Sequence, residues 1–211
     1  MVSFALVPFN NPGPTLERIE RVLLPTIQAY RDLSYEILLS DNSAQPQPQI
    51  EQFLRDRNLP HSYVWNEGRN LFYGGAINQI VQRARFDRLV YLCTSHGELN
   101  DPSWLADILA PFQHPRVAMA GSVKQISYEE LIHRTGNGLH VQGGIFAART
   151  SALRACPYTD EFPHLYSDVF IGWQLQEAGY YLADVGTIGC DWKTGRLQNK
   201  AQYKIVHEGQ R

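Results

Sequence analysis

A turn rich in glycine and amide side chains is the segment of this sequence best suited to hold an anion. Residues 66–78 read NEGRNLFYGGAIN and include Asn66, Gly74, Gly75 and Asn78. Glycine lets the backbone adopt positive φ and lets a ligand approach the main chain closely. A helix starting in this turn would add unpaired N–H groups and the positive end of its dipole, which suits a phosphate. The alternative is a closely packed strand-to-helix junction, and both roles can hold together.

Three further polar clusters follow predicted strands. They are residues 8–10 (PFN), 41–43 (DNS) and 94–98 (TSHGE). In a parallel α/β sheet, ligands bind outside the carboxyl ends of the strands. We therefore expect all four clusters to meet at one edge of a sheet and to form a single site.

The elements that must position these clusters alternate between strands and helices. Short apolar runs predict strands at 2–8, 35–39, 62–65 and 88–93, and helical periodicity follows each of the first three. Pro25 predicts a kink or a break in the first helix. The second half predicts strands at 117–120, 143–148 and 180–185 and helices at 104–109, 151–154 and 167–178, the last stopped by Gly179. This alternation is typical of an α/β fold with a mostly parallel central sheet flanked by helices.

Composition and net charge exclude several classes of protein. The chain has 211 residues, 44% of them hydrophobic, so one domain with a proper core is expected. A net charge of −2 argues against an electrostatic nucleic-acid binder. No apolar run approaches the roughly 20 residues that a membrane span needs, and the first residues lack the pattern of a signal peptide. Three widely spaced cysteines fit reduced thiols. We expect a soluble cytoplasmic protein that makes at most peripheral contact with a membrane.

In their order along the chain, these clusters resemble family 2 glycosyltransferases of the GT-A fold, particularly the rhamnosyltransferase-like branch. The matching segments are residues 7–10, 41–43, 66–78, 143–149 (GGIFAAR) and 168–179 (DVFIGWQLQEAG). The resemblance covers about residues 2–186. It implies an inverting enzyme that moves a sugar from a UDP-, dTDP- or GDP-linked donor to a hydroxyl of a glycan or lipid-linked acceptor. It also implies one Rossmann-like domain, 1–211, with a nucleotide-binding half at 1–100, an acceptor half at 101–190 and a polar tail or lid at 191–211.

The resemblance also assigns residues to the donor site. Pro8, Phe9 and Asn10 would line the base pocket, and Asp41 would accept a hydrogen bond from the base or its ribose. The alternative for Asp41 is a turn that caps a helix. The floor beneath the sugar or the diphosphate would be shaped by the glycine turn, and the donor site as a whole would include Asn66, Gly74, Gly75, Asn78 and Ser95.

The sequence departs from the family at the metal site. Family members usually carry Asp-x-Asp after the fourth strand, whereas this chain has His96 and Glu98 two residues apart. Residues at this spacing in an extended segment point to one side and can share a cation. One imidazole and one carboxylate favour Mn2+ over Mg2+. The alternative is that both side chains bind the loop or the sugar without a metal.

Asp168 is the candidate general base. An inverting transfer needs a carboxylate that takes the proton of the acceptor hydroxyl, and the start of a helix helps to keep Asp168 ionised. The alternative is an aspartate that only stabilises the helix N-terminus. Trp173 would stack on an acceptor sugar or, alternatively, fill the core.

Two other functions stay open at this stage. The missing Asp-x-Asp motif is compatible with a non-catalytic relative that binds nucleotide sugars. A nucleotidyltransferase would share the sheet, but it usually has a basic glycine-rich loop after the first strand. Residues 8–14 contain no Lys or Arg, which makes this the weakest reading.

Overall fold

A computed structural model gives the fold for most of the chain. The residues it describes are 1–94, 99, 101–126, 138–163, 166–186 and 204–206. Ser95, His96 and Glu98, which the sequence places in the donor and metal sites, lie outside these residues. Most of the predicted tail at 191–211 lies outside them as well.

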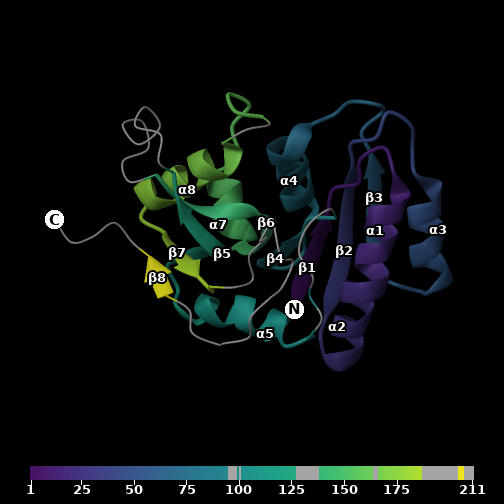
Figure 1. Cartoon of the computed structure of the whole chain (residues 1–211), viewed down its shortest axis with the longest axis horizontal. Coiled ribbons are helices and arrows are strands. Elements are labelled where there is room, and N and C mark those ends of the chain that lie inside the picture. The colour runs from purple at the N-terminus through teal and green to yellow at the C-terminus, as the bar shows by residue number, and fades with distance from the viewer. Residues whose placement is uncertain (95–98, 100, 127–137, 164–165, 187–203, 207–211) are drawn as a thin grey trace.

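Eight strands of the described residues form one sheet in the order β3-β2-β1-β4-β6-β5-β7-β8 (Figure 1). Their bounds are β1 Val2–Leu6, β2 Tyr35–Asp41, β3 His61–Trp65, β4 Arg88–Leu92, β5 Val117–Gln125, β6 Leu139–Arg149, β7 Tyr181–Asp184 and β8 Lys204–Val206. The first four strands pair in parallel, as do β5 and β7, whereas β6 runs antiparallel between β4 and β5. The predicted α/β fold with a mostly parallel sheet is confirmed.

Helices flank the sheet on both faces. Their bounds are α1 Pro12–Arg18, η1 Ile19–Leu23, α2 Leu24–Ala29, α3 Pro48–Asp56, α4 Phe72–Arg83, α5 Trp104–Leu109, η2 Ala110–Gln113, α7 Thr150–Ala155 and α8 Ser167–Glu177. The segment η1 is a π-turn, in which the N–H of Leu24 bonds to the carbonyl of Ile19. The irregularity directly precedes Pro25, so the predicted break in the first helix is confirmed.

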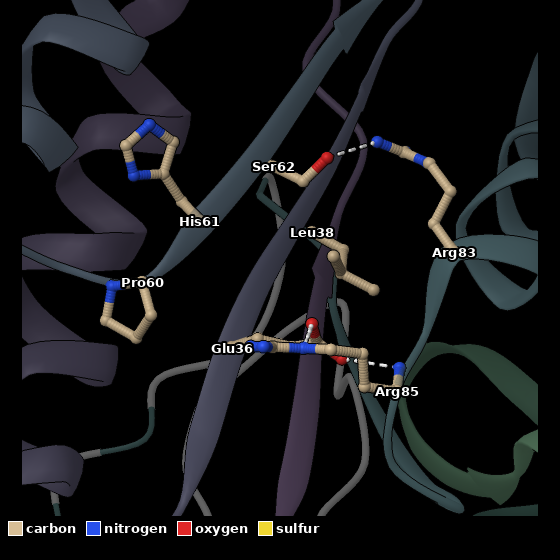
Figure 2. Close-up of a pocket in the computed structure, with 7 residues that line it drawn as sticks. All are labelled: Glu36, Leu38, Pro60, His61, Ser62, Arg83 and Arg85. Carbon is tan, nitrogen blue, oxygen red and sulfur yellow. Dashed lines mark hydrogen bonds and ion pairs between the residues drawn. The ribbon is translucent and has the colours of Figure 1, made fainter.

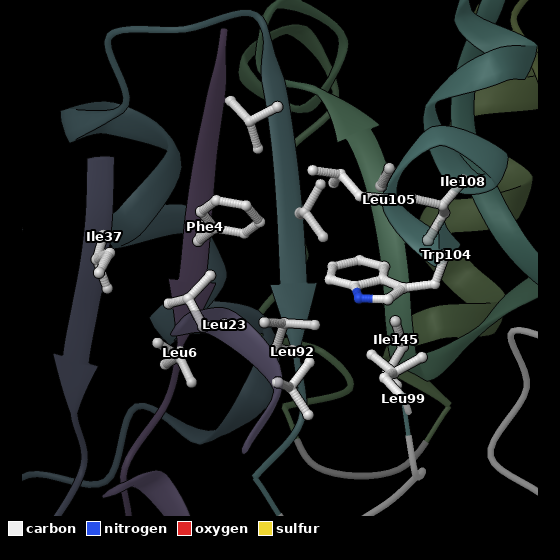
Figure 3. Close-up of a cluster of buried hydrophobic side chains, with 14 of the residues drawn as sticks. Phe4, Leu6, Leu23, Ile37, Leu92, Leu99, Trp104, Leu105, Ile108 and Ile145 are labelled. Atoms are coloured by element: carbon white, nitrogen blue, oxygen red, sulfur yellow. The ribbon is translucent and has the colours of Figure 1, made fainter. Parts of the chain in front are cut away.

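One hydrophobic layer lies between the sheet and the helices α1, η1, α3 and α5. Figure 3 shows Phe4 and Leu6 of β1 and Leu92 of β4 facing Leu23 and the indole of Trp104. The indole N–H of Trp104 donates to the hydroxyl of Thr26 at 2.9 Å, which satisfies the only polar atom of the ring. This layer therefore fixes α5 against the helices that precede β2.

A second hydrophobic layer covers the other face of the sheet. Ile77 and Ile80 of α4 pack there with Leu153 of α7 and Leu175 of α8. Side chains alternate between the two layers along β1, where Phe4 belongs to the first layer and Ala5 to the second. This layer brings α4 and α8, which carry the two principal sequence motifs, to the same face.

The C-terminal part of the sheet differs from the sequence prediction. Residues 180–185 were expected to form the last strand and 191–211 a loop or lid, but β8 pairs antiparallel with β7. Three residues, Lys204–Val206, are too few for alternation to show in a sequence. Strand β6 begins at Leu139 instead of residue 143, which brings residues 139–142 into the sheet.

No helix among the described residues is both long enough and apolar enough to span a bilayer.

Candidate functional site

The loops after β1 and β2 are tied together at the carboxyl edge of the sheet. The backbone N–H of Asn42 donates to the carbonyl of Pro8 at 3.0 Å. Asn10, at a φ of +52°, accepts a hydrogen bond from the N–H of Ala44, while its own N–H donates to the Ser43 hydroxyl at 2.7 Å. The ring of Phe9 remains 55% exposed. The structure therefore brings the predicted base-pocket residues beside the segment that follows β2.

Asp41 lies fully buried at the end of β2. Its Oδ1 accepts a hydrogen bond from the N–H of Ser43 at 2.9 Å, and its Oδ2 accepts one from the hydroxyl of Tyr63. Burial, reinforced by the bond to Asp41, raises the pKa of Tyr63, so this hydroxyl stays a donor. Both carboxylate oxygens thus have protein donors, and the contact of Asp41 with a base or ribose stays a prediction.

Asn66 is the centre of a buried amide network. Its Nδ2 donates to the hydroxyl of Ser40 at 3.0 Å and to Oδ1 of Asn42 at 2.9 Å. Its Oδ1 accepts a hydrogen bond from Nε2 of Gln79 at 2.7 Å. These bonds hold the turn that follows β3 against the end of β2 and against α4. The sequence singled out Asn66 but not Gln79, which lies one residue beyond the recognised motif.

The glycine motif packs closely against Tyr158, in the segment after α7. A Cβ on Gly74 would lie 2.9 Å from the Cβ of Tyr158, so only glycine fits there. A Cβ on Gly75 would lie 3.2 Å from the Cβ of Leu71. Asn78 bonds to both backbone groups of Tyr158. The close-packed junction is therefore present, and contact of these residues with a sugar or diphosphate stays a prediction.

Phe72 begins α4 in an unusual backbone conformation. Its φ is +55°, which is a genuine outlier for a bulky side chain, and its ring is 38% exposed. The Phe72 carbonyl accepts a hydrogen bond from Nδ2 of Asn42 at 3.0 Å. Since Asn42 also bonds to Pro8, two partly exposed aromatic residues, Phe9 and Phe72, project from loops held by the same asparagine. The sequence analysis did not single out Phe72.

Asp168 lies at the start of α8 and faces β6. Its Oδ2 accepts a hydrogen bond from the N–H of Gly143 at 3.2 Å and lies 3.9 Å from Nε2 of His140. A quarter of its side chain is exposed. The neighbouring Gly144 accepts a hydrogen bond from the N–H of Cys93, directly after β4. The antiparallel β6 thus places Asp168 at the same edge of the sheet as the ends of β1, β2 and β4.

Trp173 lies on a different side of α8 from Asp168. Five residues separate the two, which corresponds to about 140° around an α-helix. The indole meets the ring of Phe170 edge-on, with centroids 6.3 Å apart, and Phe170 in turn stacks on Phe162. Trp173 is partly buried and belongs to neither of the two hydrophobic layers, and its contact with an acceptor sugar stays a prediction.

The described residues hold no group of three or more His, Cys, Asp and Glu side chains arranged to bind a metal. The candidates His96 and Glu98 lie outside those residues, so the metal site stays a prediction.

A pocket of about 560 Å³ lies at the opposite edge of the sheet, near the starts of β2 and β3 (Figure 2). Its charged groups bond to one another. Glu36 accepts hydrogen bonds from Ser3 and from both the backbone and the guanidinium of Arg85, each at 2.7 Å. Arg83 donates to the Ser62 hydroxyl and to the carbonyl of Leu39. None of the sequence-predicted site residues lines this pocket, and its polar groups stabilise the fold.

Residues 7–160 match the family model described as glycosyl transferase family 2. The chain belongs to glycosyl transferase family 2. This match includes the four clusters of the predicted donor half, whereas Asp168 and α8 lie beyond it. No curated protein sequence matches the chain.

Solved structures show the same fold as this family 2 chain. The mannosyltransferase PcManGT from Pyrobaculum calidifontis, in complex with GDP-Man and Mn2+, is 17% identical, with a TM-score of 0.65 over 86% of this chain and 53% of that one. GalNAc-T7 with UDP, GalNAc and Mn2+ is also 17% identical, with a TM-score of 0.67 over 87% and 41%. Glucosyl-3-phosphoglycerate synthase from Mycobacterium tuberculosis, with Mn2+, UDP-Glc and phosphoglyceric acid, is 12% identical, with a TM-score of 0.55 over 87% and 68%. The chain spans about half the length of the first two.

Proposed function

We propose that this chain is an inverting glycosyltransferase of the rhamnosyltransferase-like branch, acting in polysaccharide or glycan synthesis. It would move a sugar from a UDP-, dTDP- or GDP-linked donor to a hydroxyl of a glycan or lipid-linked acceptor. The observation that carries the proposal is the placement of Asp168, a partly exposed carboxylate beside the end of β4. The nucleotides and nucleotide sugars bound in the similar solved structures support the donor class. The cytoplasmic location rests on composition alone.

The first half of the chain would hold the nucleotide. Pro8, Phe9 and Asn10 lie at the carboxyl edge of the sheet. The buried Asp41 lies at the end of β2, where Ser43 and Tyr63 donate hydrogen bonds to its carboxylate. The exposed ring of Phe9 offers an apolar face to a base. Residues 101–190 would bind the acceptor and carry the base, and residues 191–211 would form the tail or lid.

His96 and Glu98 would hold a divalent cation, and the Glu98 carboxylate is a ligand that suits Mn2+. Mn2+ is also present in the similar structures named above. When bound, such an ion supplies positive charge for the donor diphosphate. Ser95, which lies between the end of β4 and His96 in the sequence, would contact the donor.

Asp168 would act on the acceptor. The acceptor oxygen attacks the anomeric carbon from the face opposite the diphosphate, the bond from that carbon to the diphosphate oxygen breaks, and the acceptor proton moves to the Asp168 carboxylate. The N–H of Gly143 orients one carboxylate oxygen by donating a hydrogen bond to it at 3.2 Å. A single displacement of this kind inverts the anomeric configuration.

Replacement of Asp168 tests the proposal. In Asp168→Asn the amide keeps the shape of the side chain but is not a base, so we expect transfer to fall roughly 10²- to 10⁴-fold while the dissociation constant of the donor is unchanged. Asp56→Asn, at an exposed carboxylate at the end of α3, is the matched control and should keep full activity. Full transfer by Asp168→Asn would show that Asp168 is not the base. Donor binding by a wild-type chain that transfers nothing would favour the non-catalytic relative instead.

A further inference from the structure

Asn78 holds Tyr158 through both of its backbone groups. Its Nδ2 donates to the carbonyl of Tyr158 at 2.8 Å, and its Oδ1 accepts the N–H of Tyr158 at 2.9 Å. The two residues are 80 positions apart in the chain. An amide used in this way fixes the segment after α7 against α4 in one orientation.

Gly74 leaves space for the Tyr158 side chain against α4. The missing side chain of Gly74 allows the Tyr158 ring to approach the helix, because a Cβ there would meet three atoms of that side chain at 2.9 to 3.2 Å. The contact is made one turn before Asn78 on α4. Gly74 and Asn78 together therefore determine where the Tyr158 ring lies and how closely it packs against α4.

Tyr158 in turn positions Tyr73. Their hydroxyls lie 3.1 Å apart, and their rings meet edge-on with centroids separated by 5.3 Å. Burial is the main cause that raises the pKa of both tyrosines, and the nearby charge of Asp168 adds to it. Both hydroxyls therefore stay protonated at neutral pH, so either can donate to the other.

Tyr73 ends this series of contacts at the residue that holds Asp168. The ring carbon Cζ of Tyr73 lies 3.3 Å, and its hydroxyl oxygen 3.4 Å, from the place that a Cβ on Gly143 would occupy. The N–H of Gly143 donates to Oδ2 of Asp168. A shift of the Tyr73 ring would therefore move or release the backbone donor that orients the carboxylate.

We propose that Gly74 and Asn78 are positioning residues for Asp168, acting through Tyr158, Tyr73 and the N–H of Gly143. This inference rests on the proposed function for the role of Asp168. The glycine motif would then have a role other than contact with the donor. It would position the Asp168 carboxylate, although α4 lies far from Asp168 in the sequence. Displacement of a catalytic group by about 1 Å can cost 10²-fold in rate, so such a task is sufficient reason for the motif.

The test measures the surroundings of the Asp168 carboxylate without any substrate. The carboxyl carbon of Asp168 is followed by 13C NMR at one fixed pH, and its signal is assigned by its absence in Asp168→Asn. We expect Asn78→Ala and Tyr73→Phe each to shift this signal, because a displaced Gly143 N–H no longer donates to Oδ2 of Asp168 in the same geometry. Tyr35→Phe removes a hydroxyl at the opposite edge of the sheet and should leave the signal unchanged.

His140 of β6 also faces Asp168, with its Nε2 3.9 Å from Oδ2 of the carboxylate. The same spectra are therefore recorded in a His140→Gln background, where this imidazole is absent. An Asp168 signal that neither Asn78→Ala nor Tyr73→Phe shifts in this background would overturn the proposal. Tyr73→Phe retains the ring, so the test does not depend on Asn78→Ala folding well.

Nucleotide binding and transfer separate positioning from ligand contact. Positioning predicts that Asn78→Ala leaves the affinities for UDP, dTDP and GDP unchanged and lowers kcat roughly 10- to 100-fold. It predicts no further loss in the Asp168→Asn background, since the two residues act as one unit. Weaker nucleotide binding by Asn78→Ala would overturn the proposal in favour of ligand contact. Full activity of Asp168→Asn would instead reject the proposed base, and the NMR comparison of the variants would still decide the positioning.

Discussion

Glu36 shows how a buried charge is stabilised in this molecule. Only 6% of its side chain is exposed, and Ser3 and Arg85 together supply three hydrogen bonds to its carboxylate. Burial by itself would raise the pKa of Glu36, but these bonds outweigh it and hold the pKa below its usual value. Its partner Arg85 is more than half exposed, so solvent screens the ion pair and the backbone N–H and the Ser3 hydroxyl matter more.

This shift predicts a pH dependence of stability. Because the folded pKa of Glu36 lies below its unfolded value, its stabilisation is fully present above pH 4.5 and is lost as the pH falls through the folded pKa. Glu36→Gln should therefore reduce the free energy of unfolding at pH 7, with a smaller difference from wild type at pH 3. Urea unfolding across this range measures it. Glu17→Gln, at an exposed carboxylate, is the control, and a Glu36→Gln deficit that is constant with pH would contradict the prediction.

The sequence predicted individual site residues unevenly. Asn66, Gly74 and Asn78 stand out because glycines and amide side chains are grouped in one strand-to-helix segment, and the structure gives each of them close contacts. Tyr158 could not be predicted, since it carries no motif. It reaches Asn78 through a contact between segments distant in the chain.

At the scale of single elements, the end of α8 follows the sequence closely. Gly179 adopts a φ of +82°, and its N–H donates to the carbonyl of Gln176. The N–H of Tyr180 donates to the carbonyl of Leu175. This pair of bonds is the Schellman motif, so the predicted helix stop at Gly179 is confirmed. The stop directs the chain into β7 and fixes the length of α8, which carries Asp168 in its first turn.

Substitution at Gly179 should weaken this helix end. Alanine in the left-handed region costs roughly 1–2 kcal/mol, so Gly179→Ala should lower the free energy of unfolding by about that amount. Asparagine tolerates this region better, and Gly179→Asn should lose less. Thermal and urea unfolding of the two variants provide the comparison, and equal stability of Gly179→Ala and wild type would contradict it.

The bounds of the helices and strands show which features the sequence pattern predicts and which it does not. Helices such as α5 were predicted at their observed bounds, because apolar periodicity continues over the whole element. Strand β6 extends four residues before the predicted start, since His140 and Gln142 interrupt the apolar run. Those extra residues supply His140, so the error in the boundary concealed a residue beside Asp168.

At the scale of the whole molecule, the alternation of strands and helices was sufficient to predict the sheet and the edge that carries the site. The loops after β1, β2 and β3 meet there through hydrogen bonds among Asn42, Pro8 and Asn66. Antiparallel β6 brings Asp168 to that edge, and no local pattern predicts the direction of this strand. The sequence pattern therefore predicted where the loops of the first half meet, whereas Asp168 was singled out only through resemblance.

Calorimetric titration with UDP, dTDP and GDP, each with Mn2+ and again with EDTA, is the measurement that bears most closely on a nucleotide-sugar transferase. We expect one nucleotide to bind with a micromolar dissociation constant in Mn2+ and to lose that binding in EDTA. Binding unaffected by EDTA would remove the metal role of His96 and Glu98 while retaining the nucleotide site. Absence of binding by all three nucleotides under both conditions would contradict the proposed donor class.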